Sequence, residues 1–337
     1  MKLDFNTEPH KRFNILTGEW VLVSPHRTKR PWQGKRETAS APEKQVHDPS
    51  CYLCPSNTRI NGETNPPYRG TYVFENDFGA LLPSSSKFEY VEGLLRAEGE
   101  TGICKVICFS PDHSKTMADM SIVSLEEVIS TWQKEYKDLG ANPDIAHVQI
   151  FENKGEIMGC SNPHPHGQIW AQKSIPNEVL KKTQTQKVYF DRHGRSLLEA
   201  YTAQELEKKD RLVFENDTFV SLVPFWAVWP YEIMILPKRQ VQHIGLLEKK
   251  EKGDFAEQLK VVTQKYDRLF QTSFPYSAGI HQSPTNAEYP EWHFHMSFYP
   301  PLLRSATVKK FMVGYEMFGM PQRDITAEIA AESLRVL

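Results

Sequence analysis

The sequence lacks the features that mark membrane, secreted and nucleic-acid-binding proteins. Its most apolar run, residues 219–229, falls short of the about 18 apolar residues that a membrane span needs. Residues 1–14 contain no apolar run of the kind found in signal peptides. The formal net charge of −2 provides no positive field large enough for nucleic acid. We therefore expect a cytoplasmic protein with neither a membrane nor a nucleic acid as its partner.

Cysteine is scarce as well, with 5 residues in a chain of 337. So few cysteines indicate reduced thiols or metal ligands and not a framework of disulfides. Apolar residues make up 39% of the chain, and 7 Trp, 13 Tyr and 18 Phe are among its aromatic residues. This composition predicts a packed globular protein, long enough for one large core or for two of ordinary size.

The densest chemistry lies in one twelve-residue stretch, GCSNPHPHGQIW, which ends at residue 170. Side chains alternate along an extended chain, so His164, His166 and Gln168 are expected to line one face. Pro163 and Pro165 favour extended backbone at the edge of a sheet. An imidazole there could attack phosphorus, with the glutamine donating to phosphate oxygens. The alternative is a histidine-rich edge strand that carries no chemistry.

A Cys-x-x-Cys motif, Cys51 and Cys54, is the best candidate for a metal site. A redox role is less favoured because the surrounding sequence lacks a thioredoxin-like pattern. A tetrahedral zinc ion needs two more ligands. His113 and His164 are candidates, although they are distant in the sequence and the spacing alone does not pair them with the cysteines.

Two halves of the chain repeat the same order of elements. The pentapeptide FENDF at residues 74–78 returns as FENDTF at residues 214–219. Each copy is followed by a strand that ends near a proline, an amphipathic helix and a pair of strands. Helices are expected to begin at Ser124 and at Asp254, each with a capping box. We interpret the chain as two copies of one unit of roughly 150 residues.

The repeat predicts two domains and a fold class. The N-terminal half, residues 1–176, would contain the metal motif and His166, and residues 177–337 would form the C-terminal half. The second half retains a His-x-His, at His293 and His295, without the glutamine. The expected fold is α+β, with mostly antiparallel sheets and helices packed on them.

Two polar segments have the composition of phosphate and sugar sites. Arg27 and Arg30 belong to a basic loop, and guanidinium groups pair with phosphate oxygens in a bidentate fork. A set of hydrogen-bonding side chains follows near the C-terminus, where Lys would meet phosphate and Glu and Gln would meet hydroxyls. This set is Lys310, Tyr315, Glu316 and Gln322. Solvated surface charge is the alternative for both segments.

Over essentially its whole length the sequence resembles the galactose-1-phosphate uridylyltransferases, a branch of the histidine-triad superfamily. The resemblance depends on five long matches in the right order, which are more specific than any single motif. The matches are residues 12–20, 24–34, 151–155, 159–170 and 304–316. It implies a duplicated histidine-triad-like fold and a homodimer with active sites at the subunit boundary.

The resemblance also implies a reaction with two displacements. His166 would attack the α-phosphorus of UDP-glucose, expel glucose 1-phosphate and hold UMP as a phosphoramidate. Galactose 1-phosphate would then accept the uridylyl group, which gives ping-pong kinetics. The same resemblance would make Gln168 a contact of the transferred phosphate and Ser161 a contact of the β-phosphate.

Further site residues follow from matching positions of the family. Uridine-side and ribose-side positions correspond to Asn76, Asp77 and Asn153. Arg27 and Arg30 correspond to residues that reach the nucleotide sugar from the neighbouring subunit. The hexose-phosphate loop corresponds to Lys310, Val313, Tyr315, Glu316 and Gln322. A zinc ion that braces the strand of His166 would be held by Cys51, Cys54, His113 and His164.

The sequence departs from the family at a second metal site, which some bacterial relatives use for iron or zinc. His281 and His295 match two of the ligands, but Lys182 and Ser297 replace a glutamate and a third histidine. A protonated lysine has no lone pair for a metal, and serine is a poor ligand beside imidazoles. Glu178, one helical turn away, is a possible substitute. We expect this site to be empty or weak.

Two other functions compete with uridylyl transfer. A nucleotide-sugar hydrolase or phosphorylase of the same superfamily would use the same histidine, but a hydrolase has no need of the loop at residues 310–322. A zinc-stabilised nucleotide-binding module without activity is disfavoured by the intact pair of His166 and Gln168.

Overall fold

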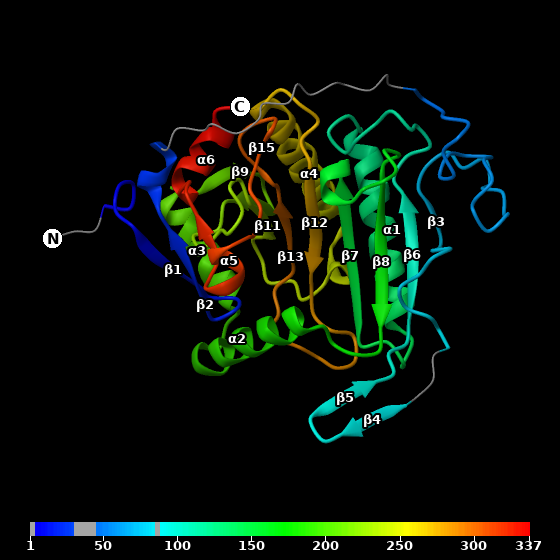
Figure 1. Ribbon diagram of the computed structural model, residues 1–337, viewed down its shortest axis with the longest axis horizontal. Coiled ribbons are helices and arrows are strands. Elements are labelled where there is room, and N and C mark those ends of the chain that lie inside the picture. The colour runs from blue at the N-terminus through cyan, green and yellow to red at the C-terminus, as the bar shows by residue number, and fades with distance from the viewer. Residues whose placement is uncertain (1–3, 30–44, 85–87) are drawn as a thin grey trace.

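The computed structural model describes residues 4–29, 45–84 and 88–337, and its centre is one sheet of nine antiparallel strands (Figure 1). In spatial order the strands are β3 (Tyr72–Glu75), β6 (Gly102–Cys108), β8 (His166–Gln172), β7 (His147–Lys154), β12 (Tyr276–His281), β13 (His295–Tyr299), β11 (Ile233–Pro237), β10 (Phe219–Leu222) and β9 (Leu212–Glu215). The predicted α+β class and the antiparallel pairing are confirmed.

The order of the strands repeats in mirror image about the centre of the sheet. From the outside inwards, β3, β6, β8 and β7 in one half correspond to β10, β11, β13 and β12 in the other. The halves meet where β7 pairs with β12, with Lys154 opposite Tyr276 and Phe151 opposite Gly279. The sheet is therefore continuous across the boundary that the sequence predicts after residue 176.

Two long helices, α1 (Ile122–Gly140) and α4 (Lys249–Leu269), cover one face of this sheet and lie behind it in Figure 1. Both present the apolar stripe that their sequence predicts. From α1, Val128 and Trp132 are buried, and from α4, Leu259 and Tyr266 are buried in the same core. Removing these side chains from water is the main stabilising contribution on this face.

Both helices begin several residues before the predicted starts. Ser121 is the N-cap of α1, and its side chain accepts a hydrogen bond from the backbone N–H of Ser124, the residue expected to be the cap. In α4 the capping box is formed by Glu248 and Glu251 and not by Asp254. Asp254 lies inside the helix and accepts a hydrogen bond from the Thr218 hydroxyl at 2.7 Å. Asp254 thus ties α4 to a neighbouring turn and does not cap the helix.

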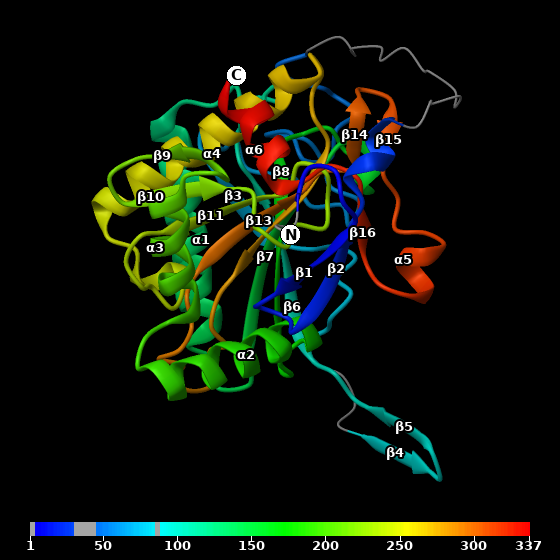
Figure 2. The same cartoon turned by 90° about the vertical axis from the view of Figure 1, so that its left-hand side faces the viewer.

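Smaller elements lie at the rim of the sheet and on its face opposite α1 and α4. The remaining α-helices of the described residues are α2 (Asn177–His193), α3 (Leu197–Lys208), α5 (Tyr315–Phe318) and α6 (Ala327–Arg335), and short 3-10 helices occur at Pro25–Lys29, Glu156–Met158 and Ile244–Leu246. The remaining strands are β1 (His10–Asn14), β2 (Glu19–Val23) and β16 (Gln322–Arg323), β14 (Leu302–Ser305) and β15 (Val308–Lys309), and β4 (Glu89–Glu92) and β5 (Leu95–Glu98). Figure 2 shows α5 and the β4–β5 hairpin projecting from the same side of the molecule. None of the helices in the described residues has the length and apolarity required to cross a bilayer.

A buried network of charges fastens the N-terminal strand to the C-terminal helix. Glu328 of α6 accepts hydrogen bonds from Arg12 of β1 at 2.9 and 3.0 Å and from Arg211 at 2.7 Å. Arg211 also pairs with Glu205 of α3 at 2.9 Å. The side chain of Arg12 is 1% exposed and that of Glu205 is 1% exposed. Such a network resists separation of the termini because each buried charge depends on its partner.

Candidate active site

A cavity of about 160 Å³ opens on the face of the sheet opposite α1 and α4. Its walls come from β6, β7 and β8, from the turn after β3 and from the segment before β8. Six predicted site residues line it together: Asn76, Asp77, Asn153, Ser161, His166 and Gln168. The structure therefore brings these six residues together around one cavity.

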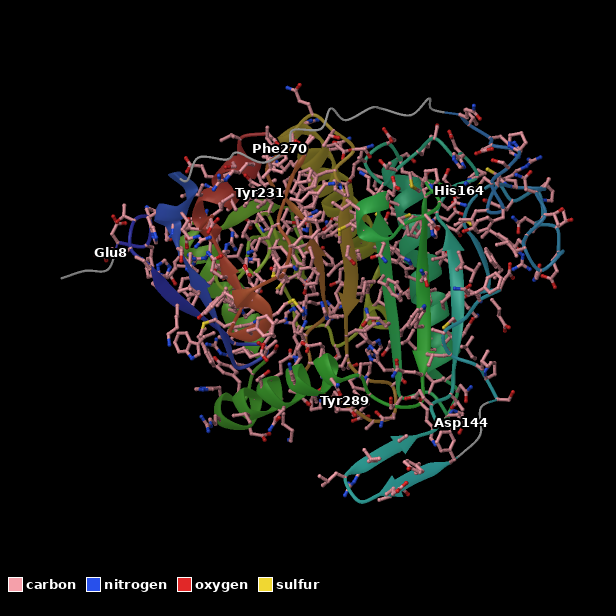
Figure 3. The ribbon with its side chains drawn as sticks, viewed as in Figure 1. Glu8, Asp144, His164, Tyr231, Phe270 and Tyr289 are labelled. Carbon is pink, nitrogen blue, oxygen red and sulfur yellow. The ribbon has the colours of Figure 1, made fainter. Side chains whose placement is uncertain are left out.

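The strand that carries His166 is internal to the sheet and is not an edge strand. β8 pairs with β6 on one side and with β7 on the other. The prediction from the prolines was wrong because the regular strand begins at His166, just after Pro165. His164 precedes the strand and is 1% exposed. Contrary to the expectation from the sequence, it therefore does not share the cavity face with His166 and Gln168. Figure 3 shows His164 at the upper end of the sheet, beside the segment that leads to β3.

The His166 ring is held in one tautomer. Its Nδ1 lies 2.7 Å from the carbonyl oxygen of His164, so Nδ1 carries the proton and donates it. Nε2 therefore retains a lone pair. Burial lowers the pKa of His166, while the hydrogen bond to His164 opposes that shift. The ring is thus a neutral nucleophile at pH 7, oriented by the backbone of the preceding histidine.

Gln168 and Asn153 are also oriented by their neighbours. The indole Nε1 of Trp170 donates to the side-chain oxygen of Gln168 at 2.9 Å, which leaves the amide N–H groups of Gln168 for the cavity. The hydroxyl of Ser277 donates to the side-chain oxygen of Asn153 at 2.7 Å. Both amides can therefore present donors to an anionic group beside His166.

The turn after β3 forms another wall of the cavity. The side-chain oxygen of Asn76 accepts a hydrogen bond from the backbone N–H of Phe78 at 3.0 Å. Asp77 pairs with the guanidinium of Arg59 at 3.1 Å. In the second half, the side-chain oxygen of Asn216 accepts a hydrogen bond from the backbone N–H of Phe219. The amide nitrogen of Asn216 donates to the carbonyl oxygen of Asp254 in α4. The repeated motif thus lines a cavity in one half and supports a helix in the other.

Four residues next to the cavity could hold a metal ion. The ligand atoms of Cys51, Cys54, His113 and His164 all lie within 4.8 Å of one another. Two thiols and two imidazoles are a typical donor set for tetrahedral zinc. The sequence left the pairing of these distant residues open, and the fold brings them together.

The side chains around this cluster suit a bound cation. The Nε2–H of His164 donates to the carbonyl oxygen of Ser110 at 2.9 Å, so its Nδ1, 3.6 Å from the Cys54 sulfur, has a free lone pair. Asn162 accepts a hydrogen bond from the backbone N–H of His164, and its amide nitrogen lies 3.4 Å from the Cys51 sulfur. Burial raises the pKa of Cys54 to about 11, so a thiolate at this position needs a positive ion beside it.

The second group of predicted residues does not line the cavity. None of Arg27, Lys310, Val313, Tyr315, Glu316 and Gln322 lines it. Arg27 and Gln322 both donate to Asp324, at 3.1 and 2.7 Å, and Lys310 forms an ion pair with Glu316. Arg30 lies outside the described residues. Val313 and Tyr315 are 57% and 52% exposed, so this group has apolar surface available for another molecule.

The residues that match a second metal site form a different arrangement. His281 and His295 stack with ring centroids 4.7 Å apart, and the amine of Lys182 lies 3.0 Å from Nδ1 of His281. Burial lowers the pKa of Lys182 to about 8. The exposed Glu178 pairs with Lys181. Nδ1 of His295 donates to the carbonyl of His293 at 3.1 Å, as His166 does to His164.

Several residues that shape the site were missed from the sequence. Tyr68 lies 3.1 Å from Nε2 of His164, and Asn162, Trp170, Arg59 and Asp324 orient their neighbours as described. Most act across long separations in the chain, for which spacing gives no signal. Asn162 and Trp170 lie within the motif itself, where position alone did not distinguish them.

Two family models cover almost the whole chain. Residues 1–176 match the family described as galactose-1-phosphate uridyl transferase, N-terminal domain. Residues 182–337 match the family described as galactose-1-phosphate uridyl transferase, C-terminal domain.

Curated relatives in distant organisms carry the same description, galactose-1-phosphate uridylyltransferase. The relative from Haemophilus influenzae is 54% identical over 98% of this chain and 94% of its own. Those from Rattus norvegicus and Saccharomyces cerevisiae are 49% and 47% identical, over 97% and 100% of this chain and 87% and 96% of theirs.

Solved structures share the fold at lower identity. An ADP-glucose phosphorylase from Arabidopsis thaliana superimposes with a TM-score of 0.77 and 25% identity, over 98% of this chain and 99% of its own. A structure described as uridylyltransferase gives 0.76 and 25%, over 97% of both chains. The same fold thus occurs in an ADP-glucose phosphorylase and in a uridylyltransferase, while the curated relatives of higher identity are described as galactose-1-phosphate uridylyltransferases.

Proposed function

The chain belongs to the galactose-1-phosphate uridylyltransferase family, and from this premise we propose that His166 carries the uridylyl group between the two sugar phosphates. The activity is the transfer of UMP from UDP-glucose to galactose 1-phosphate. The observation that supports His166 most strongly is its single tautomer, with Nδ1 bonded to the His164 carbonyl and Nε2 free. A uridylyl adduct on this residue is the direct test.

In the first step Nε2 of His166 attacks the α-phosphorus of UDP-glucose. The new N–P bond forms as the bond to the bridging oxygen breaks, and that oxygen leaves with glucose 1-phosphate. The ring becomes positively charged, which strengthens the bond from its Nδ1–H to the carbonyl of His164. The amide N–H groups of Gln168 stabilise charge on the phosphoryl oxygens. Ser161 contacts the leaving phosphate.

In the second step galactose 1-phosphate occupies the place that glucose 1-phosphate has left. A phosphate oxygen attacks phosphorus, the N–P bond breaks, and its electrons return to Nε2 of His166. The neutral ring and UDP-galactose result. Asn76, Asp77 and Asn153 hold the uridine throughout, so one nucleotide pocket serves both steps and positions the phosphorus for each attack.

The enzyme is proposed to act as a homodimer with shared active sites. One chain provides the cavity with His166, while neither its Arg27 nor its 310–322 loop lines that cavity. A second copy that supplies Arg27, Arg30 and the loop would complete the site for the hexose phosphate. The exposed Val313 and Tyr315 on this loop support contact with another chain.

Mixed dimers test this arrangement. Arg27→Ala and His166→Gly proteins, each of low activity alone, should regain activity after subunit exchange. Equal mixing makes about half of the dimers mixed, and each has one intact site, so roughly a quarter of wild-type activity should return. Steady-state rates before and after exchange measure this, with two Arg27→Ala samples exchanged as the control. A rate that stays at the sum of the parents, with exchange shown by mass spectrometry, would place Arg27 in its own chain's site.

The metal cluster is proposed to bind one zinc ion through Cys51, Cys54, His113 and His164. Zinc would join three distant segments and neutralise the thiolates. The carbonyl of His164 orients the ring of His166. A zinc ion that fixes His164 would therefore also fix the orientation of the nucleophile. Free thiols that serve as metal ligands suit a reducing compartment, and we propose a cytoplasmic location.

Metal analysis tests both predicted sites. Protein from metal-replete medium should contain about one zinc per chain, since Lys182 already donates to His281. Among the described residues, His281 and His295 belong to no group of three His, Cys, Asp or Glu whose ligand atoms could hold a metal. Cys54→Ser should lose this zinc, and His281→Ala should keep it. Elemental analysis by mass spectrometry provides the count. Two tightly held ions, the second absent from His281→Ala, would show that Lys182 does not exclude the metal.

A further inference from the structure

Arg59 lies behind the cavity wall without lining the cavity. Its guanidinium is 3.1 Å from Oδ1 of Asp77 and 4.4 Å from the centroid of the Phe74 ring. Asp77 and Phe74 both line the cavity, while Arg59 does not. The side chain of Arg59 is 6% exposed. The guanidinium of Arg59 therefore supports two cavity residues, Asp77 and Phe74, from the side that faces away from the cavity.

The chain around Arg59 is held firmly in place. Its backbone N–H donates to the carbonyl of Glu63 at 2.7 Å, and its own carbonyl accepts from Gly62 at 3.0 Å. The amide of Asn65 donates to the carbonyls of Tyr52 and Cys54 at 2.9 and 3.1 Å. The turn with Arg59 is thus tied to the segment of the metal motif, so Arg59 has a fixed base from which to hold Asp77.

One carboxylate oxygen of Asp77 is bonded to Arg59, and the other is available as an acceptor. Oδ1 is paired with Arg59, and within the described ranges no donor lies within hydrogen-bond distance of Oδ2. The carboxylate is 10% exposed. A buried carboxylate with an oxygen available in a cavity can accept a ligand hydroxyl through a charge-assisted hydrogen bond. Without Arg59 the same carboxylate would lose its orientation and the charge that stabilises it.

We propose that Arg59 is a positioning residue that holds Asp77 for the 2′-hydroxyl of the ribose and so sets a preference for ribonucleotides over 2′-deoxyribonucleotides. The inference rests on the proposed uridine pocket and assigns Arg59 a role in specificity. It predicts a change that a merely structural residue would not cause. Loss of Arg59 should weaken binding of the ribonucleotide more than binding of the deoxyribonucleotide.

The test compares UMP with 2′-deoxy-UMP by titration calorimetry on the metal-loaded protein. Wild type should bind UMP about tenfold more tightly, the scale of one hydrogen bond to a charged group. In Arg59→Met, which keeps an apolar chain over Phe74, UMP should weaken about tenfold and the two ligands should bind within about twofold of each other. Arg59→Lys keeps the charge without the planar guanidinium, so its preference for UMP should lie between those of wild type and Arg59→Met.

Glu63→Gln is the matched control, because it removes only the exposed partner of Arg59, and it should keep the wild-type preference. If Arg59→Met does not fold, Arg59→Lys carries the same comparison. Equal loss of both ligands, or a preference unchanged in both Arg59 variants, would overturn the proposal and leave the uridylyl mechanism intact. A protein that keeps the binding preference but never forms the adduct would refute that mechanism and leave Arg59 in its role.

Discussion

Protein incubated with UDP-glucose alone should gain one uridylyl group per active site, and the His166→Gly protein should gain none. Without galactose 1-phosphate the first step has no acceptor to complete the cycle, so the adduct accumulates. Intact-protein mass spectrometry detects the gain. Because a phosphoramidate is labile in acid and stable in base, the added mass should disappear after mild acid treatment. Adding galactose 1-phosphate should release it as UDP-galactose.

The same substitution should reduce turnover by about a million-fold, the scale seen when an enzyme loses its nucleophile. Folding should be unaffected, since His166 faces a cavity and not the apolar core. His193→Gln, which alters an exposed histidine of α2, is the matched control and should keep both adduct and turnover. A wild-type protein that turns over both substrates, yet gains no adduct when it is incubated with UDP-glucose alone, would exclude the two-step mechanism.

Glu328→Ala should have the largest effect on stability, lowering the free energy of unfolding by about 3–5 kcal/mol. The substitution leaves Arg12 unpaired in the protein interior and deprives Arg211 of one of its two carboxylates. Urea unfolding monitored by tryptophan fluorescence measures the change. Glu332→Ala, an exposed glutamate of the same helix, should shift stability by less than about 0.5 kcal/mol. Equal effects of the two substitutions would mean that the network does not stabilise the fold.

The network should also make the free energy of unfolding depend on pH in the acid range. Burial raises the pKa of Glu328, but the hydrogen bond and charge of Arg12, together with the hydrogen bond of Arg211, outweigh it and hold the pKa at about 2. A carboxyl whose pKa is lower in the folded chain stabilises it above the unfolded pKa of about 4.3. That contribution should be lost as the pH falls from about 4 to 2. Glu328→Ala should lack this part of the acid dependence.

Elements with a strong local pattern could be predicted from the sequence. The apolar stripes of α1 and α4 are visible in the spacing of their residues, and the helices exist with those stripes buried. Their starts were misplaced because Ser124 and Asp254 also have capping chemistry, and only the neighbouring Ser121 and Glu248 have the extended backbone of a cap. Local patterns identify an element more reliably than they identify its ends.

The candidate site was predictable where one motif concentrates it. His166 and Gln168 follow from alternation along β8, and His164 departs from that alternation because the strand starts after it. Arg59 and Asp324 were missed because their partners lie far along the chain or have no characteristic spacing. Ion pairs of this kind depend on how strands and loops meet in three dimensions, which composition and periodicity do not encode.

The pairing of β7 with β12 has a consequence for synthesis on the ribosome. About 120 residues separate the two strands, which at about 5–20 residues per second is a delay of roughly 6–24 s. During that time the nascent N-terminal half presents β7 as a free edge, with backbone groups open to pairing with a neighbouring nascent chain. Chaperone capture of this edge, or slow translation before residue 276, would therefore influence how much enzyme a cell obtains from each messenger.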